Sequence, residues 1–348
     1  MWNITLRNMQ FRARQLLITI VGTALVFAMA LLVTGLKEAF KTEADQATAS
    51  IGGDAWVVPA GPEGPFTGLN FMDAGSADQI RAAPGVRKAD PVLLVPKIIR
   101  KGSSVKTLWV VGHRRHGLGE PPPEEGRRSR ARGEVVVDKK LGFGLGDTFT
   151  VSGREFTAVG LVSGHTMTGG QPMVYVPIED IWALLHVGAV AKAVVITGTP
   201  RRLPHGYKAL SRQQVRDDML HPLRSAESAI NNTRLLLWLV AAVIVGVVMY
   251  MSALERVRDF AVLKAVGATT RTLVLSLAAE AVLTCLIAAA LAIGLAQLLL
   301  PIFPLPITYT LGAYAVLPVI AVVVGVLASL AGVRRAVRTD PALAFAGT

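Results

Sequence analysis

The sequence predicts a membrane α-helical protein with four transmembrane helices in a 1+3 arrangement and a large extracytoplasmic α+β domain inserted between helices 1 and 2. Three observations predict this fold class: the mean hydropathy is +0.48, the apolar residues gather in four long blocks, and short basic segments flank the blocks. Of the 348 residues, 52% are hydrophobic and 17% are charged, which excludes an intrinsically disordered chain. The single cysteine, Cys285, excludes a fold held by internal disulfides.

Four apolar blocks are long enough to cross a bilayer as helices. The predicted spans are residues 16–36, 235–254, 273–300 and 311–333. As a helix, the first span is about 31 Å long, which matches a hydrocarbon core of about 30 Å. The first span is also longer than the apolar region of a signal peptide, so we expect an uncleaved anchor.

The flanking charges predict how the chain is oriented. Lys and Arg of short loops are retained on the cytoplasmic side. Basic residues occur in the N-terminal segment 1–15, in the connection 255–272 and in the C-terminal tail 334–348. We therefore expect both termini in the cytoplasm and the segment 37–232 outside it.

The outer segment 37–232 is large enough to fold around its own core. Short β-rich runs recur in it at residues 55–58, 92–99, 105–111, 135–137 and 173–176. Residues 149–151 and 156–159 flank a Ser-Gly-Arg turn and predict a β-hairpin. Ser76 with Gln79, and Ser211 with Gln214, have the spacing of helix capping boxes.

Two outer segments are predicted to be loops. Residues 164–170 are rich in glycine and predict a flexible loop. Four arginines, Arg127, Arg128, Arg130 and Arg132, follow a proline-rich and acidic stretch. They favour a solvated flexible loop, and the alternative is a surface for anionic lipid headgroups or cell-wall polymers.

No catalytic residues and no metal site are predicted. His113 and His116 are separated by two arginines, which would oppose a cation, and no Cys or carboxylate ligands follow at a suitable spacing. The phosphate-binding motif G-x-x-x-x-G-K-[ST] is absent from the sequence, so we expect a partner polypeptide to hydrolyse any ATP. The net charge of +12 does not predict nucleic-acid binding, because no basic stripe carries interleaved aromatic residues.

The connection between the second and third spans has the most specific pattern. If it is helical, its apolar residues gather on one side, while Glu255, Arg258, Asp259 and Lys264 supply charges elsewhere. Gly267 would then end the helix as a C-cap. Two interpretations stay open here: an amphipathic contact helix, and a solvated turn that obeys the positive-inside rule.

At this point the sequence resembles the MacB/FtsX-type (DevC-like) permease subunits of ABC transporters. Their segment after the second span typically reads Glu-Arg, two residues, an acidic residue, a short apolar stretch, Arg or Lys, Ala, any residue, Gly and Ala. The matching residues are Glu255, Arg256, Asp259, Leu263, Lys264, Ala265, Gly267 and Ala268. In the C-terminal tail, basic residues Arg334 and Arg335 followed by Asp340 and Pro341 are similar to the family's C-terminal ending.

The resemblance implies a permease in the bacterial cytoplasmic (inner) membrane that forms a homodimer and binds two copies of a separate ABC ATPase. ATP and Mg would be held by that ATPase, and this chain would carry no cofactor. Contact with the ATPase would involve Glu255, Arg256, Arg258, Asp259, Lys264, Gly267, Asp340 and Pro341. The spans would transmit ATP-driven closure to the outer domain, a process called mechanotransmission.

The expected function is export of a lipid, peptide or other amphiphile, with an extracytoplasmic adaptor or binding protein as a further partner. Two alternatives stay open. The chain could be a mechanotransmitter that regulates an extracellular enzyme without transporting anything, or a permease for amino-acid uptake.

Glu280 is an ionisable residue inside the third predicted span. A carboxylate at that depth costs a few kcal/mol unless it is paired or hydrated. We favour pairing with Arg271 or Lys264 near the cytoplasmic interface over a role in substrate or proton binding. Small residues of the last two spans, including Gly294 and Gly325, permit close helix contacts, either within the chain or across a dimer seam.

Overall fold

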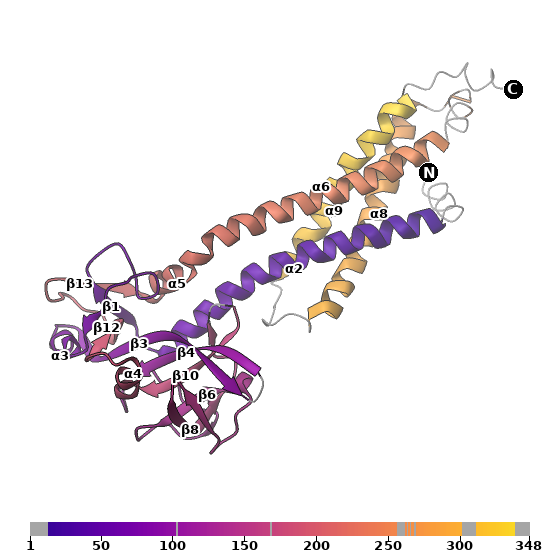
Figure 1. The fold of residues 1–348 in the computed structure, drawn as a ribbon. Helices are drawn as coiled ribbons and strands as arrows, with labels where there is room; N and C mark the ends of the chain where they lie inside the picture. The colour runs from indigo at the N-terminus through magenta and orange to yellow at the C-terminus, as the bar shows by residue number, and fades with distance from the viewer. Residues whose placement is uncertain are drawn as a thin grey trace. The chain divides into compact units, whose positions relative to one another are not determined.

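The computed structural model describes residues 13–101, 104–167, 169–255, 262, 264, 266–267, 269–300 and 311–337. The chain divides into two compact units, which we name the helical unit (Met1–Ala39 and Ala226–Thr348) and the outer unit (Phe40–Ser225). The helical unit consists of long apolar helices, and the outer unit is an α+β domain (Figure 1).

The outer unit is built on one mixed sheet. Among the described residues the sheet has 11 strands, in the order β13-β1-β12-β3-β4-β10-β6-β8-β5, with β7 paired to β8 and β9 paired to β10. The strands are β1 Ala55–Pro59, β3 Val86–Lys101, β4 Ser104–His113, β5 Glu125–Gly126, β6 Glu134–Asp138, β7 Thr148–Val151, β8 Arg154–Val162, β9 Thr166–Met167, β10 Gln171–Pro177, β12 Ala193–Gly198 and β13 Tyr207–Ser211. A separate pair joins β2 Met72–Asp73 to β11 Val190–Ala191.

Both faces of the central strands are buried. In β4, Leu108 and Val110 contribute to one hydrophobic cluster, and Val111 contributes to another. Neighbouring side chains of a strand point to opposite faces, so a strand covered on both sides reads as a nearly continuous apolar run. Helix α4 (Ile178–Leu185) packs into the first cluster, and the outer end of helix α2 (Ala13–Ile51) packs into the second.

The predicted hairpin is confirmed. Strands β7 and β8 pair antiparallel, with Val151 opposite Arg154, around the two-residue turn Ser152–Gly153. The φ angles of the turn residues are 47° and 84°. Positive φ at both positions is what a type I′ turn requires, and this turn matches the natural twist of a hairpin.

One predicted capping box is confirmed and the other is wrong. Helix α5 (Arg212–Leu220) starts with the Ser211 side chain accepting a hydrogen bond from the Gln214 amide. Helix α3 (Ser76–Arg81) does start at Ser76, but no side chain caps it. The Ser76 hydroxyl instead donates to the backbone carbonyl of Asp73 at 2.6 Å, so it is not available to the helix amides.

The helical unit contains most of α2, together with α6 (Arg224–Glu255), α8 (Thr270–Leu299) and α9 (Leu311–Val337). Three described stretches are long and apolar enough to cross a membrane, namely Leu16–Ile51, Ser228–Glu255 and Thr270–Leu299. The apolar stretch Tyr314–Leu330 of α9 is shorter over the part of the chain that is described. Several apolar helices thus agree with a membrane protein, while the 1+3 arrangement of four spans stays a prediction.

Helix α2 continues well beyond the predicted end of the first span. We placed that end at residue 36, whereas the helix ends at Ile51. Residues 37–51 lack glycine and proline, and the helix ends before Gly52 and Gly53, whose φ angles are 82° and 80°. Because glycine adopts positive φ without strain, this pair ends the helix where the apolar pattern could not show it.

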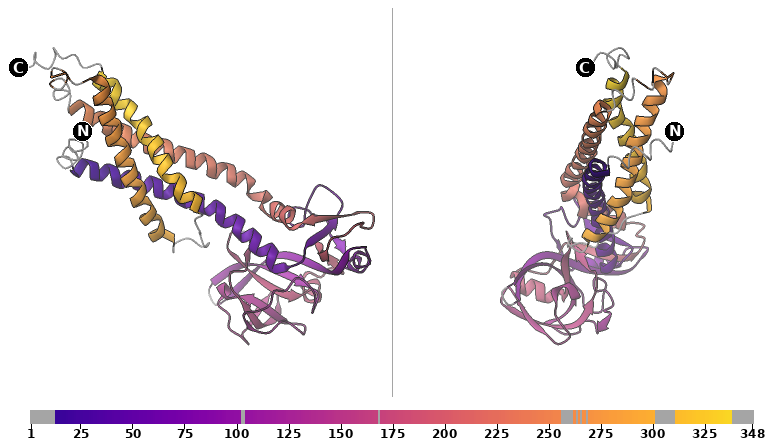
Figure 2. Two further views of the ribbon diagram at one scale, coloured as in Figure 1. Left: turned by 180° about the vertical axis from the view of Figure 1, so that it is seen from behind. Right: turned by 90° about the vertical axis from the view of Figure 1, so that its right-hand side faces the viewer.

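Helices α8 and α9 lie side by side in the two views of Figure 2. A Cβ atom added to Gly325 of α9 would lie 2.7 Å from the Cα atom of Val282 in α8. The two backbones are therefore in close approach at this glycine. This contact supports the interpretation that Gly325 serves packing within the chain.

Candidate functional site

The predicted coupling segment lies largely outside the described residues. This holds for Arg256, Arg258, Asp259, Asp340 and Pro341. Glu255 is the last residue of α6. Gly267 has a φ of 101°, and its amide donates to the carbonyl of Lys264 at 3.0 Å. That geometry is typical of a glycine C-cap, and the role of the segment in ATPase contact stays a prediction.

Glu280 lies on α8 with 2% of its surface exposed. The Thr284 hydroxyl one turn later donates to the backbone carbonyl of Glu280 at 2.8 Å. The Glu280 side chain is thus enclosed by the helical unit and not exposed on its surface. Its pairing with Arg271 or Lys264 stays a prediction.

The outer end of α2 is held inside the outer unit by apolar packing. Ala44, Ala47 and Ile51 are each at most 1% exposed and belong to the same cluster as Trp56 and Tyr175. The last two turns of the helix therefore form part of the domain core. They do not serve as a linker.

A buried carboxylate adds a polar attachment. Glu43 of α2 is 5% exposed, and its Oε1 and Oε2 atoms accept hydrogen bonds from the amides of Gly170 (2.6 Å) and Gly169 (2.9 Å). The two glycines belong to the segment that we expected to be a flexible loop. Hydrogen bonds to a charged group are stronger than those between neutral groups, so this contact fixes the loop to the helix.

A second polar attachment runs from α2 to the sheet. The Tyr175 hydroxyl donates to Ser50 Oγ at 2.9 Å and lies 2.8 Å from His165 Nδ1. Because the phenol has only one proton, the His165 ring nitrogen must be the donor in the second contact. Burial raises the pKa of Tyr175 and lowers the pKa of His165, so near neutral pH both groups are uncharged. We name the contacts of Glu43, Ser50 and the buried apolar residues of this helix end the α2 anchor.

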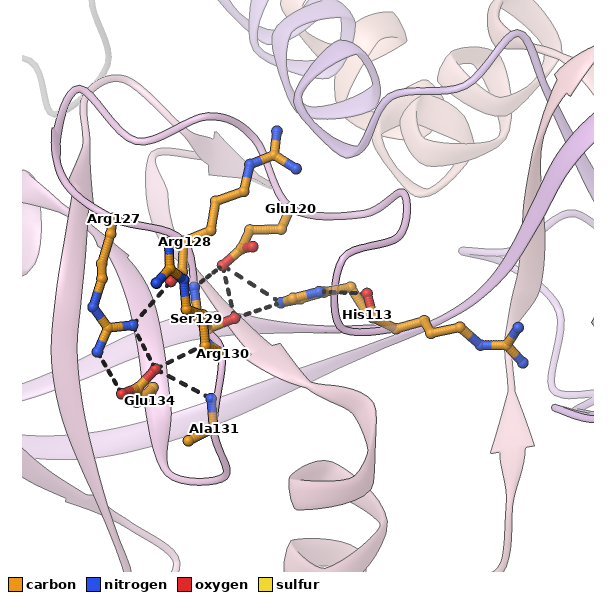
Figure 3. Close-up of polar contacts among 9 residues, drawn as sticks. His113, Glu120, Arg127, Arg128, Ser129, Arg130, Ala131 and Glu134 are labelled. Atoms are coloured by element: carbon orange, nitrogen blue, oxygen red, sulfur yellow. Dashed lines mark hydrogen bonds and ion pairs between the residues drawn. The ribbon is translucent and has the colours of Figure 1, made fainter.

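A separate buried polar cluster lies at the end of β4 (Figure 3). His113 is fully buried, with Nδ1 3.2 Å from the Arg114 carbonyl and Nε2 3.4 Å from Ser129 Oγ. The Ser129 amide and hydroxyl both donate to Glu120 Oε1, at 2.9 Å and 2.8 Å. Burial lowers the pKa of His113, and the negative charge of Glu120 partly opposes this effect.

Serine, histidine and carboxylate are also the parts of a hydrolytic triad, but the geometry here differs. In such a triad the carboxylate orients the histidine and the serine is open to substrate. Here Glu120 accepts from Ser129 directly, and His113 and Ser129 are 0% and 1% exposed. The cluster therefore joins the loop that carries Glu120 and Ser129 to strand β4 of the sheet. It is a structural contact that sequence reasoning missed.

The arginine-rich loop is solvent-exposed at Arg127, Arg128, Arg130 and Arg132, as expected for a solvated loop, and it also makes several hydrogen bonds. Glu134 accepts two hydrogen bonds from the Arg127 guanidinium (2.6 and 2.7 Å) and others from the amides of Arg130 and Ala131 (Figure 3). The hydrogen bond from Arg127 is the main reason that the pKa of Glu134 is lowered to about 2. Two carboxylates thus bind the loop. Glu120 accepts hydrogen bonds from Ser129, and Glu134 accepts them from Arg127 and from the loop backbone.

We expect acidification to destabilise the outer unit through His113. Its folded-state pKa lies below its unfolded value of about 6.5, so the unfolded chain takes up more protons as the pH falls through that value. Stability should fall by up to about 1.4 kcal/mol per pH unit in this window. Glu120 and Glu179 act against this loss, and Arg128 adds to it.

The measurement is the Tm of the purified full chain between pH 7.5 and 5.0. His113→Gln should show a smaller acid-induced decrease in Tm than the unmodified protein, whereas His205→Gln, at an exposed position, should not. His165 contributes in the same direction, so part of the dependence should persist. Equal decreases in His113→Gln and the unmodified protein would contradict the prediction.

Comparison with known proteins covers both units. The family model for the MacB-like periplasmic core domain matches residues 16–202, and the model for the FtsX-like permease C-terminal region matches residues 234–341. An uncharacterized ABC transporter permease of Mycobacterium bovis is 43% identical over 343 residues, which is 98% of each chain. One of Mycobacterium tuberculosis is 42% identical over 344 residues, again 98% of each chain.

Two solved structures are similar to part of the chain. The periplasmic region of MacB from Actinobacillus actinomycetemcomitans covers 48% of this chain and 92% of its own, with 14% identity and a TM-score of 0.37. The extracellular domain of the transporter YknZ from Gram-positive bacteria covers 46% and 99%, with 11% identity and a TM-score of 0.35. From the two family models and the full-length mycobacterial relatives, the chain belongs to the MacB/FtsX-type family of ABC transporter permeases.

Proposed function

We propose that this permease couples ATP hydrolysis on a separate ATPase subunit to movement of its extracytoplasmic domain, and that the movement exports a lipid, peptide or other amphiphile. An ABC transporter permease has an ATPase partner and a membrane context, and the MacB-like domain lies on the periplasmic side of the inner membrane. The finer steps, which are mechanotransmission, the separate ATPase and the substrate class, are our proposal.

The observation that carries the proposal is the continuity of α2. The helix runs without a break from Ala13 to Ile51, and its residues after Ala39 belong to the outer unit. Backbone hydrogen bonds within a helix resist stretching and bending, so a displacement at one end is passed to the other. The α2 anchor then attaches the helix to the outer unit, to the 164–170 loop through Glu43 and to the sheet through Ser50.

At the cytoplasmic end, we propose that the segment from Glu255 to Gly267 contacts the ATPase. The support is the family motif and the position of the segment in the sequence, directly after the long apolar helix α6, whose described residues reach Glu255. Two copies of the permease with two ATPase subunits would complete the assembly, with ATP and Mg on the ATPase.

Reversing two acidic charges tests this contact. In the double variant Glu255→Lys and Asp259→Lys, we expect recovery of the ATPase with the permease to fall by about tenfold, the effect of about 1.4 kcal/mol of lost binding. The measurement is co-purification from lipid, followed by ATP hydrolysis with and without the permease.

The matched control reverses the exposed outer acids Glu125 and Glu155, which changes the net charge equally without touching the segment. Unchanged recovery and unchanged ATP hydrolysis in the Glu255 and Asp259 variant would refute the proposed contact. Intact coupling without movement of any amphiphile across the membrane would instead support the regulatory alternative.

A further inference from the structure

The helical unit contains a cavity of about 290 Å³ between α2, α6 and α9. Its α2 wall runs from Glu38 down to Ala30, which is about 12 Å along the helix. Glu38 lies next to the start of the outer unit, so this end of the cavity is the end nearer the extracytoplasmic domain. If the first span ends at residue 36, as the sequence predicts, the cavity would run from headgroup depth toward the hydrocarbon region.

The cavity lining combines two kinds of side chain. Glu38, Thr34 and Arg234 are polar, while others such as Leu31 and Leu317 are apolar. An apolar cavity with a few polar groups is the usual form of a small-molecule site. A lining that combines charged groups with apolar side chains suits an amphiphile.

Arg234 is the group most clearly prepared for a ligand. Its guanidinium carbon lies 5.1 Å from the centre of the Trp238 ring, so the ring holds the side chain on the cavity wall. Its Nε atom is buried and has no hydrogen-bond partner among the residues that the structure describes. A buried donor without a partner is costly, and a phosphate oxygen would satisfy it in the two-pronged geometry that arginine favours.

Glu38 on the same cavity wall restricts the choice of headgroup. A carboxylate oxygen on this wall can accept a charge-assisted hydrogen bond from a cationic amine, in addition to any contact it already makes. We propose that the cavity binds a zwitterionic phospholipid of the outer leaflet, with its phosphate on Arg234, its amine toward Glu38, and the upper part of an acyl chain in the apolar region. The claim that this lipid is transported rests on the export function proposed above. The claim that the cavity binds it does not.

Binding is tested on the full chain without any ATPase, so failure here and failure of the coupling proposal are distinguishable. The probes are phosphatidylethanolamine, phosphatidylglycerol and diacylglycerol with identical acyl chains, and retention is measured by native mass spectrometry from detergent. We expect phosphatidylethanolamine to be retained best. Arg234→Gln should lower its retention by about tenfold, from the loss of a charge-assisted contact.

Glu38→Gln should weaken retention of phosphatidylethanolamine and narrow its advantage over phosphatidylglycerol. The control is Arg202→Gln, an exposed position of the outer unit, which should leave retention unchanged. Equal retention of the three lipids by the unmodified chain, or retention unaffected by Arg234→Gln, would overturn the proposal.

A second measurement needs no change at the charged positions. In nanodiscs, phosphatidylethanolamine brominated on the upper part of its acyl chains should quench tryptophan fluorescence, and Trp238→Phe should remove most of that quenching. Quenching that is the same in Trp238→Phe would show that the lipid does not occupy the cavity.

Discussion

Replacing Glu43 with leucine is expected to destabilise the outer unit by about 2–4 kcal/mol. The carboxylate accepts hydrogen bonds from the amides of Gly169 and Gly170, and leucine would leave both of these part-buried donors without that acceptor. Each such donor costs about 1–3 kcal/mol. Glu43→Gln keeps one acceptor oxygen and should have a smaller effect. The measurement is the Tm of the full chain in nanodiscs.

The matched control lies two residues further along α2. Asp45 pairs with Arg216 at 3.3 Å, but the Asp45 side chain is 55% exposed. Exposed ion pairs contribute about 0–1 kcal/mol, so Asp45→Ala should change the Tm little. If Glu43→Leu were no more destabilising than Asp45→Ala, the α2 anchor would not depend on the buried carboxylate.

The same variant also tests the transmission of movement. With the ATPase bound, Glu43→Leu should leave ATP hydrolysis nearly intact and reduce export, because the attachment at the outer end of α2 is weakened. Equal loss of hydrolysis and export would instead indicate a general folding defect.

Replacing Gly325 with leucine should separate α8 from α9 and destabilise the helical unit by about 1–3 kcal/mol, the usual cost of overpacking. The added Cβ atom would lie 2.7 Å from the Val282 backbone, which cannot rotate away as a side chain could. The measurement is the Tm in detergent, together with the oligomeric state.

Gly294→Leu is the matched control, because a Cβ atom at Gly294 meets no atom within 4 Å. The two variants should therefore differ clearly in Tm. A lower fraction of dimer in Gly294→Leu, without a change in Tm, would assign that glycine to a dimer seam. Equal Tm values in the two variants would contradict close packing at Gly325.

Features that depend on residues near one another in the sequence were predicted well. The hairpin at Ser152–Gly153 and the capping box at Ser211 follow from local turn and cap chemistry, and both are present. The capping box predicted at Ser76 is absent for an equally local reason. A hydroxyl with a competing backbone acceptor, here the Asp73 carbonyl, does not cap the helix even though the spacing is suitable.

Features that depend on distant residues were not predicted. Glu43 and Gly169 are far apart in the sequence, and no local pattern marks a carboxylate whose partners are backbone amides. His113 drew attention only as a metal ligand, whereas its contacts are with Ser129 and Glu120. The contacts of the arginine-rich loop were also not predicted, because composition does not show that Arg127 donates to Glu134.

The sequence by itself determined the apolar helices, several β-rich runs of the outer unit, the family and the absence of a phosphate-binding loop, because each is written in local composition or in a contiguous motif. Only the tertiary structure decided where α2 is attached, which polar groups are buried, and that Arg234 and Glu38 share one cavity. The physical reason is that burial and hydrogen-bond partners depend on which surfaces meet when the chain folds. Sequence periodicity shows which face of a helix or strand is apolar, but it does not show which other surface that face contacts.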